Sequence, residues 1–193
     1  MGIDRQPTLL HWNYFLAIEE DLAKLSRYVD FIGNNDSTFS LEIARILFAA
    51  SSEVDVVLKQ LCLVINPASS AENINTYFNE ITPAIPTFCG FKVLIPRFGL
   101  TLEPWIDWKA AASPEWWKAY NKVKHERHIH FDKATLKNCL NSVAALYISL
   151  LHLYKTEATN GDLMLLPQLF NVTDANFGGT GMGRWGHYFR YNI

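Results

Sequence analysis

Cysteine, net charge and long apolar runs are all scarce in this sequence, and each scarcity excludes a class of protein. The three cysteines, Cys62, Cys89 and Cys139, are an odd number without a CxxC pair. This pattern argues against a disulfide framework or a zinc ribbon and predicts buried free thiols. The longest uncharged apolar run, at residues 142–151, is too short to cross a bilayer. With neither a signal-peptide pattern nor a myristoylation motif, we expect a soluble cytoplasmic protein that does not contact membranes.

The formal net charge is only −2, so the whole molecule exerts no bulk attraction on nucleic acid or on anionic lipid. Any such attraction must come from a local patch. Hydrophobic residues make up 49% of the 193 residues and charged residues 19%, which is typical of an ordinary globular chain. We therefore expect one domain over residues 1–193.

Apolar residues recur at helical spacing as far as about residue 157. With the capping and breaking residues between them, they predict helices at 8–32, 40–65, 71–81, 115 to about 130, and 133–157. Ser70 and Ser113 are the expected caps of the third and fourth helices. The second helix is apolar over most of its circumference, so we place it at the centre as the most buried element.

Two segments lack helical periodicity. Prolines and extended apolar runs at 91–108 predict a small β-hairpin, the only extended structure expected. The predicted fold is thus all-α: a four-to-five-helix bundle (core 8–157) with this short insertion and a non-helical C-terminal tail at 158–193. In the tail, GMGRWG matches the glycine pattern of a pyrophosphate loop, but no strand precedes it. Packing of the tail aromatics Trp185, Tyr188 and Phe189 onto the bundle or a second subunit is the preferred interpretation.

The segment EWWKAYNKVKHERHIHF, residues 115–131, differs from the rest of the chain. Between residues 118 and 137 there are six basic residues and two acidic ones. On a helix, Trp116, Tyr120 and Val123 would point inward, and an adjacent face would carry Asn121, Lys124, His125 and His128. This face could bind phosphate through its cations and transfer a proton through an imidazole. The alternative is a solvated basic face that covers an aromatic stripe.

A metal site is a third interpretation, because His125, His128 and His130 all offer nitrogen ligands. On a continuous helix His125 and His128 lie one turn apart, but His130 falls where the helix should end, and no other cluster completes a site. We assign no metal and no cofactor. Two carboxylates of the second helix, Glu53 and Asp55, are expected to support the basic segment.

We expect at least one of these carboxylates to pair with Lys124 or Arg127, because a carboxylate near an apolar arc needs a cation or a hydrogen-bond donor.

The order of the helices, together with the Asn-Lys-Val-Lys-His stretch ending at His125, resembles the HEPN superfamily over about residues 10–157. The resemblance implies an all-helical bundle, often dimeric, with two copies of the motif facing each other. Active members are metal-independent ribonucleases of toxin–antitoxin and phage-defence systems, and others are inactive binding modules. The partners implied are a second copy of the chain, RNA or a nucleotide, and a cognate antitoxin protein.

The family's catalytic pattern is an arginine, often followed by a polar residue, and then a histidine. Carried over, Asn121 matches the polar residue and His125 the histidine, whereas Tyr120 occupies the place of the arginine. The resemblance then implies that His125 transfers a proton and that Asn121 orients the imidazole or the phosphate. The residues expected to bind phosphate or RNA are Lys118, Lys122, Lys124, Arg127 and His128. Two hypotheses follow, a metal-independent ribonuclease and a non-catalytic module that binds RNA, a nucleotide or a protein.

Overall fold

A computed structural model describes residues 2, 8–163, 165–172, 180–182 and 189–191, with the backbone alone at 180–182 and 189–190. Within these residues the chain forms six α-helices: α1 (Leu10–Leu25), α2 (Leu41–Ile65), α3 (Ile74–Ala84), α4 (Glu115–His130), α5 (Leu136–Leu153) and α6 (Lys155–Asn160). The short strands are β1 (Val93–Ile95), β2 (Leu100–Leu102), β3 (Asn171–Val172), β4 (Thr180–Met182) and β5 (Phe189–Tyr191). The mostly helical fold confirms the predicted class in its main part.

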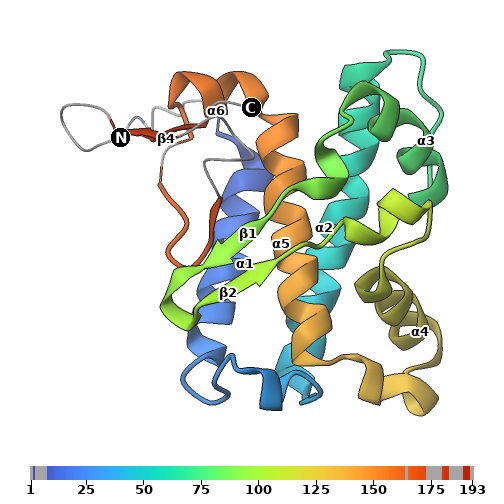
Figure 1. Ribbon diagram of the computed structural model, residues 1–193, viewed down its shortest axis with the longest axis vertical. Coiled ribbons are helices and arrows are strands. Elements are labelled where there is room, and N and C mark those ends of the chain that lie inside the picture. The colour runs from blue at the N-terminus through green and yellow to red at the C-terminus, as the bar shows by residue number, and fades with distance from the viewer. Residues whose placement is uncertain (1, 3–7, 164, 173–179, 183–188, 192–193) are drawn as a thin grey trace.

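The long helices α2 and α5 pack along each other at the centre, with α1 on one side and α3 and α4 on the other (Figure 1). The predicted bounds of α2 are confirmed, because Ser40 caps its first turn by accepting from the Ile43 amide at 3.1 Å. The expectation that α2 is the most buried helix is wrong. Fourteen of the eighteen residues of α5 are buried, against eleven of twenty-five in α2. The reason is that α1, α2, α4 and β2 all cover α5.

Three other helices differ from their predicted bounds. The helix predicted at 133–157 begins at Leu136, where the Thr135 hydroxyl accepts from the Asn138 amide at 3.3 Å, and it ends at Leu153, because Tyr154 leaves the helical conformation before α6. Helix α1 ends at Leu25 rather than near residue 32, because Ser26 turns its hydroxyl back onto the Ala23 carbonyl and a turn follows. Helix α3 begins at Ile74, where Asn73 and Thr76 form a reciprocal capping box, so Ser70 is not its cap. Pro83 lies in the last turn of α3, where it interrupts little of the helix.

The predicted hairpin is confirmed, but it is not the only extended structure. Strands β1 and β2 are antiparallel, and Gly99 provides the left-handed turn between them with φ of 62°. The tail contributes β3, which pairs with the other edge of β1, and the antiparallel pair of β4 and β5. The sequence showed no alternation in these two- and three-residue strands, so periodicity could not find them.

A buried carboxylate fixes the start of the tail against the bundle. Glu19, on α1, is 2% exposed and accepts from the backbone amides of Gln168, Leu169 and Phe170 at 2.8–3.0 Å. These three bonds compensate the desolvation of the carboxylate. Farther along, the hydroxyls of the buried Tyr191 and Tyr147 lie 3.1 Å apart. The GMGRWG stretch extends into residues 183–186, which lie outside the described residues. The predicted packing of Trp185, Tyr188 and Phe189 also falls outside them, since only the backbone of Phe189 is described.

All three cysteines are buried and free, as predicted. Burial raises the pKa of the Cys62 thiol to about 12, with a smaller contribution from Glu80. In the part of the chain described here, none of the helices combines the length and the apolar character that a membrane span requires.

Candidate nucleic-acid interface

Helix α4 owes its start to a residue of the preceding segment. The Asp107 carboxylate accepts from the amide of Glu115 at 3.0 Å, which satisfies one of the free donors of the first turn. Pro114 occupies the capping position in an extended conformation. Ser113 is therefore not the cap that the sequence predicted, and its hydroxyl donates instead to Asn75 Oδ1 at 3.3 Å.

The inner face of α4 is aromatic, as predicted. Trp116, Tyr120 and Val123 are buried, together with Trp117. The indole of Trp116 donates to the Pro104 carbonyl at 2.8 Å, so its polar group is satisfied in the interior. This face anchors α4 on the bundle and leaves its other face to solvent.

The outer face of α4 carries the predicted cations, and their side chains are exposed: Lys118, Lys122, Lys124, His125, Arg127 and His128. Glu115 neutralises Lys118 locally, with Nζ and Oε1 2.6 Å apart. Within the described residues, no carboxylate lies within ion-pairing distance of Lys122, Lys124 or Arg127. We call these three residues, which are spread around the exposed side of α4 and its kinked end, the basic surface. Its charge is free to attract an anion.

A kink divides α4 near its end. The backbone leaves the helical region at Glu126, where φ is −137° and ψ is 46°. His125 and His128 therefore do not lie one turn apart on a continuous helix, as the sequence suggested. After the kink, His130 Nε2 lies 3.4 Å from the Glu126 carboxylate. Across the residues that the structure describes, no group of three or more His, Cys, Asp or Glu side chains could hold a metal ion.

The residues matched to the family's motif have separate environments. Tyr120, at the place of the arginine, is 5% exposed, and its ring packs edge-on against Phe48. The Lys124 ammonium lies 5.4 Å from the centre of the Tyr120 ring, a cation–π contact. Asn121 is half-buried, and its amide nitrogen donates to the Trp117 carbonyl at 3.1 Å. The carbonyl oxygen of the Asn121 side chain is therefore its group available to a ligand.

The two supporting carboxylates of α2 point to different neighbours. Glu53 Oε1 lies 2.5 Å from His11 Nδ1 on α1, and His11 Nε2 lies 2.7 Å from the Gln60 amide nitrogen. Asp55 Oδ1 accepts from the Tyr77 hydroxyl of α3 at 3.1 Å. Neither carboxylate forms the expected ion pair with Lys124 or Arg127 within the described residues. Residues two apart on a helix point about 200° from each other, so Glu53 faces His11 on α1 and away from α4. Asp55 faces the side of α3 and α4, where the Tyr77 hydroxyl satisfies one of its oxygens in place of a cation.

Asp55 nevertheless borders the basic surface. It lines a pocket of about 390 Å³ between α2, the start of α3 and α4, which we call the polar pocket. The polar groups of its lining are the carboxylates of Asp55 and Glu72, the amides of Asn73, Asn75 and Asn121, and the ammonium of Lys124. Trp117 and Tyr120 also line it. The polar pocket is therefore a recess rich in hydrogen-bonding groups at the edge of a cationic face.

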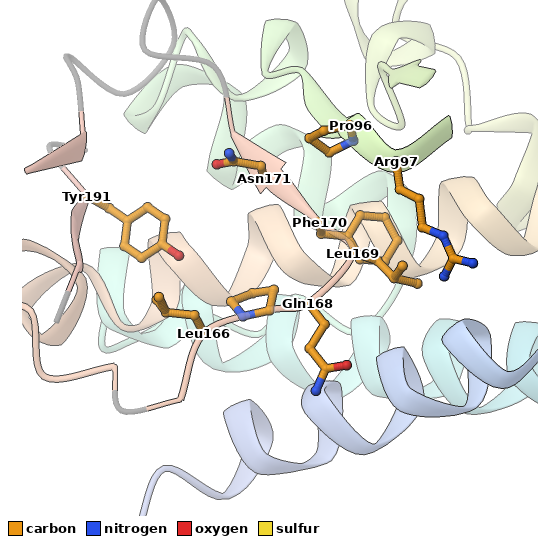
Figure 2. A pocket seen from close by; sticks show the side chains of 9 residues that line it. Pro96, Arg97, Leu166, Gln168, Leu169, Phe170, Asn171 and Tyr191 are labelled. Atoms are coloured by element: carbon orange, nitrogen blue, oxygen red, sulfur yellow. The ribbon is translucent and has the colours of Figure 1, made fainter. Parts of the chain in front are cut away.

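A second pocket, of about 200 Å³, lies between the turn after β1 and residues 166–171 of the tail (Figure 2). Arg97 lies on its hairpin side, and Tyr191 lies across from it (Figure 2). Arg97 is the only charged residue in this lining, and its other polar side chains are those of Gln168, Asn171 and Tyr191.

A wider hollow of about 730 Å³ lies between the C-terminal part of α2 and α6. Its lining is largely apolar, with Leu61, Val64 and Phe91 among its members, and it includes Lys155 and the buried His152. It has no cluster of charges that would select a ligand.

The sequence did not predict the link between His11, Glu53 and Gln60 or the polar pocket. His11 is 42 residues from Glu53, and only the fold brings α1 onto that face of α2. The one local signal was the spacing of Glu53 and Gln60, seven residues apart on one helix face. The polar pocket combines three helices and likewise has no local pattern.

No protein-family model, no curated protein and no solved structure matches this chain, so no function passes to it from a relative.

Proposed function

We propose that this chain is a HEPN-like module that binds RNA through the basic surface of α4. The observation that carries the proposal is the set of exposed, unneutralised cations Lys122, Lys124 and Arg127 in a chain with a formal charge of −2. Such a local concentration of positive charge attracts the phosphate backbone, because binding releases counterions from the nucleic acid. The surface is anchored by a rigid aromatic face, so little ordering is required when a ligand binds.

Single-stranded RNA fits this surface better than a duplex. The polar pocket adjoins the cations and is lined by Trp117, Tyr120 and several amides, which suit the exposed edge of an unpaired base. A duplex would present its phosphates but keep its base edges paired. The arginine of the family's catalytic pattern is replaced by the buried Tyr120, which favours binding over cleavage.

A metal-independent ribonuclease is the second candidate, and the exposed imidazole of His125 beside Lys124 favours it. RNA carries its own nucleophile, the 2′-hydroxyl, so cleavage needs a proton-transfer group and cations that stabilise the phosphorane. His125 would transfer the proton, and Lys124 and Arg127 would stabilise the developing charge. In this form the protein would be a toxin of a phage-defence or toxin–antitoxin system, held inactive by a cognate antitoxin protein.

The same proposal includes a homodimer that brings two basic surfaces together. An apolar patch next to the end of α4 supports it. Ile129 is 61% exposed and Phe39 is 48% exposed, and the Phe39 ring meets the Phe131 ring edge-on at 5.6 Å. Exposed apolar residues that gather beside a functional face commonly form an interface.

The test is binding and cleavage of a labelled single-stranded RNA in the presence of EDTA. We expect the wild type to bind the RNA, with an affinity that falls steeply as salt rises. Lys122→Ala should weaken binding and reduce the slope of log K against log salt by about 0.7, because one phosphate contact is lost. The matched control is Lys24→Ala on α1, whose ammonium is paired with Glu20 at 2.9 Å, and it should bind as the wild type does.

Cleavage separates the two candidates. Intact RNA after incubation supports the binding module, whereas cleavage that survives EDTA and is lost in His125→Ala supports the ribonuclease. Absence of RNA binding at low salt contradicts both.

A further inference from the structure

The polar pocket contains a carboxylate, that of Asp55, which forms no ion pair with any of the described residues. Asp55 is half-buried, and within the described residues its hydrogen-bond partner is the Tyr77 hydroxyl. Burial, and then the charge of Asp55, raise the pKa of Tyr77, so the phenol keeps its proton and remains the donor. The second oxygen of Asp55 is left as an acceptor for a ligand. A half-buried carboxylate that shares a pocket with Lys124 repels a phosphate, which indicates that it serves another part of the ligand.

The other polar groups of the pocket can be assigned by the bonds that they already make. Asn121 donates to its own helix, so its side-chain carbonyl is an available acceptor. Asn75 accepts from Ser113 through Oδ1, so its amide nitrogen is an available donor. Glu72 Oε1 is engaged with Lys59 at 3.5 Å. The pocket therefore offers acceptors from Asp55 and Asn121, a donor from Asn75 and the ammonium of Lys124.

We propose that the polar pocket binds a guanine base attached to a phosphate, and that in the RNA complex it selects an unpaired guanosine. This inference rests on the proposed function only in taking RNA as the molecule that supplies the guanine. Guanine alone among the four bases presents two adjacent donors, N1–H and N2–H, beside an acceptor, O6. The Asp55 carboxylate can accept from both donors, through its second oxygen and the remaining lone pair of Oδ1, and the Asn75 amide donates to O6.

The other bases complement this lining less well. Uracil offers one donor flanked by two carbonyls, which the carboxylate repels. Adenine and cytosine each place a ring nitrogen acceptor beside the amino group, where it would face Asp55. The volume of about 390 Å³ lies within the range of small-ligand pockets. Lys124 lines the pocket and is also exposed, so it can hold the phosphate of the bound nucleotide.

The experiment compares labelled oligouridylate with the same oligomer carrying one central guanosine or one central adenosine, and adds free guanosine monophosphate as a competitor. We expect the single guanosine to increase affinity about tenfold over both other oligomers. Asp55→Asn should remove this difference while retaining the affinity for oligouridylate. Asparagine keeps an acceptor for Tyr77 and places its amide donor against the donors of guanine. Asn75→Ala, at an exposed position, should reduce the preference without affecting the fold.

Lys122→Ala, outside the pocket lining, should weaken all three oligomers equally. If guanosine monophosphate competes with RNA for the wild type but not for Asp55→Asn, a free nucleotide is sufficient for binding. If the preference for guanosine is seen only within the RNA oligomers, the neighbouring nucleotides are needed. Both results support the guanine pocket. Binding of all three oligomers with equal affinity, or a guanosine preference that persists in Asp55→Asn, overturns it and leaves the RNA-binding proposal standing. Asp55-dependent binding of the nucleotide without any binding of RNA overturns the RNA-binding proposal alone.

Discussion

His152 is a histidine that its surroundings hold neutral. It is 5% exposed, and the rings of Phe88 and Phe91 lie 5.2 and 4.8 Å from its imidazole. Burial, with a smaller contribution from Lys155, lowers the pKa of His152 from 6.5 to about 3. The unfolded chain protonates this residue at mildly acidic pH, whereas the folded protein does not.

This difference predicts how stability depends on pH. Between pH 6.5 and about pH 3 the unfolded state binds the extra proton, so the free energy of unfolding rises with pH and falls on acidification. We expect a loss of about 1.4 kcal/mol per pH unit from this residue at and below about pH 5.5. His152→Leu should show a shallower dependence in urea unfolding between about pH 7 and about pH 5. Equal pH dependence in the two proteins would contradict a neutral buried imidazole.

The contact between His11 and Glu53 leads to a second prediction about single residues. The two side chains are only 15% and 13% exposed, so His11→Ala leaves a carboxylate largely desolvated without its main partner. We expect the free energy of unfolding to fall by about 2 kcal/mol. The control is Lys24→Ala, which breaks an exposed, solvent-screened pair and should leave the free energy of unfolding nearly unchanged. If His11→Ala lowers the free energy of unfolding no more than Lys24→Ala does, the contact between His11 and Glu53 contributes nothing to stability.

At the scale of the element, α4 depends on a cap from outside its own sequence. Asp107→Ala removes the acceptor for the Glu115 amide, so we expect the protein to be about 1 kcal/mol less stable. Glu115→Ala is the control, because it keeps the capped amide and breaks only the exposed ion pair with Lys118, so it should change stability much less than Asp107→Ala. Urea unfolding of the three proteins measures both effects. If the two variants are equally stable, Asp107 is not the cap.

The helices also show what the sequence could and could not predict. The bounds of α2 were predictable because Ser40 and Asn66-Pro67 are local signals, and the inward aromatics of α4 followed from spacing alone. Asp107 could not be identified as a cap, since it lies eight residues from the amide that it accepts from. The break at Glu126 could not be predicted either, because no proline or glycine lies within α4 to signal it. The partners of Asp55 depend on which helix packs against each face of α2, and periodicity does not specify this.

At the scale of the whole molecule, the apolar patch beside α4 predicts self-association. We expect light scattering to give twice the chain mass of 22.0 kDa. Ile129→Asp should restore the mass of one chain, because a charge replaces an exposed apolar contact. Val64→Asp is the control: Val64 is 64% exposed, but lies near the opposite end of α2 from Phe39. A wild-type protein with the mass of one chain at high micromolar concentration would contradict the dimer.

The distribution of charge over the molecule favours RNA binding at α4 and not elsewhere. Photochemical cross-linking of a labelled single-stranded RNA, followed by mass spectrometry of the peptides, tests this directly. We expect cross-linked peptides within residues 115–133, which contain the basic surface, and a loss of cross-links in the Lys122→Ala and Arg127→Ala double variant. Cross-links confined to the hollow beside Lys155, or none under conditions of low salt, would contradict it.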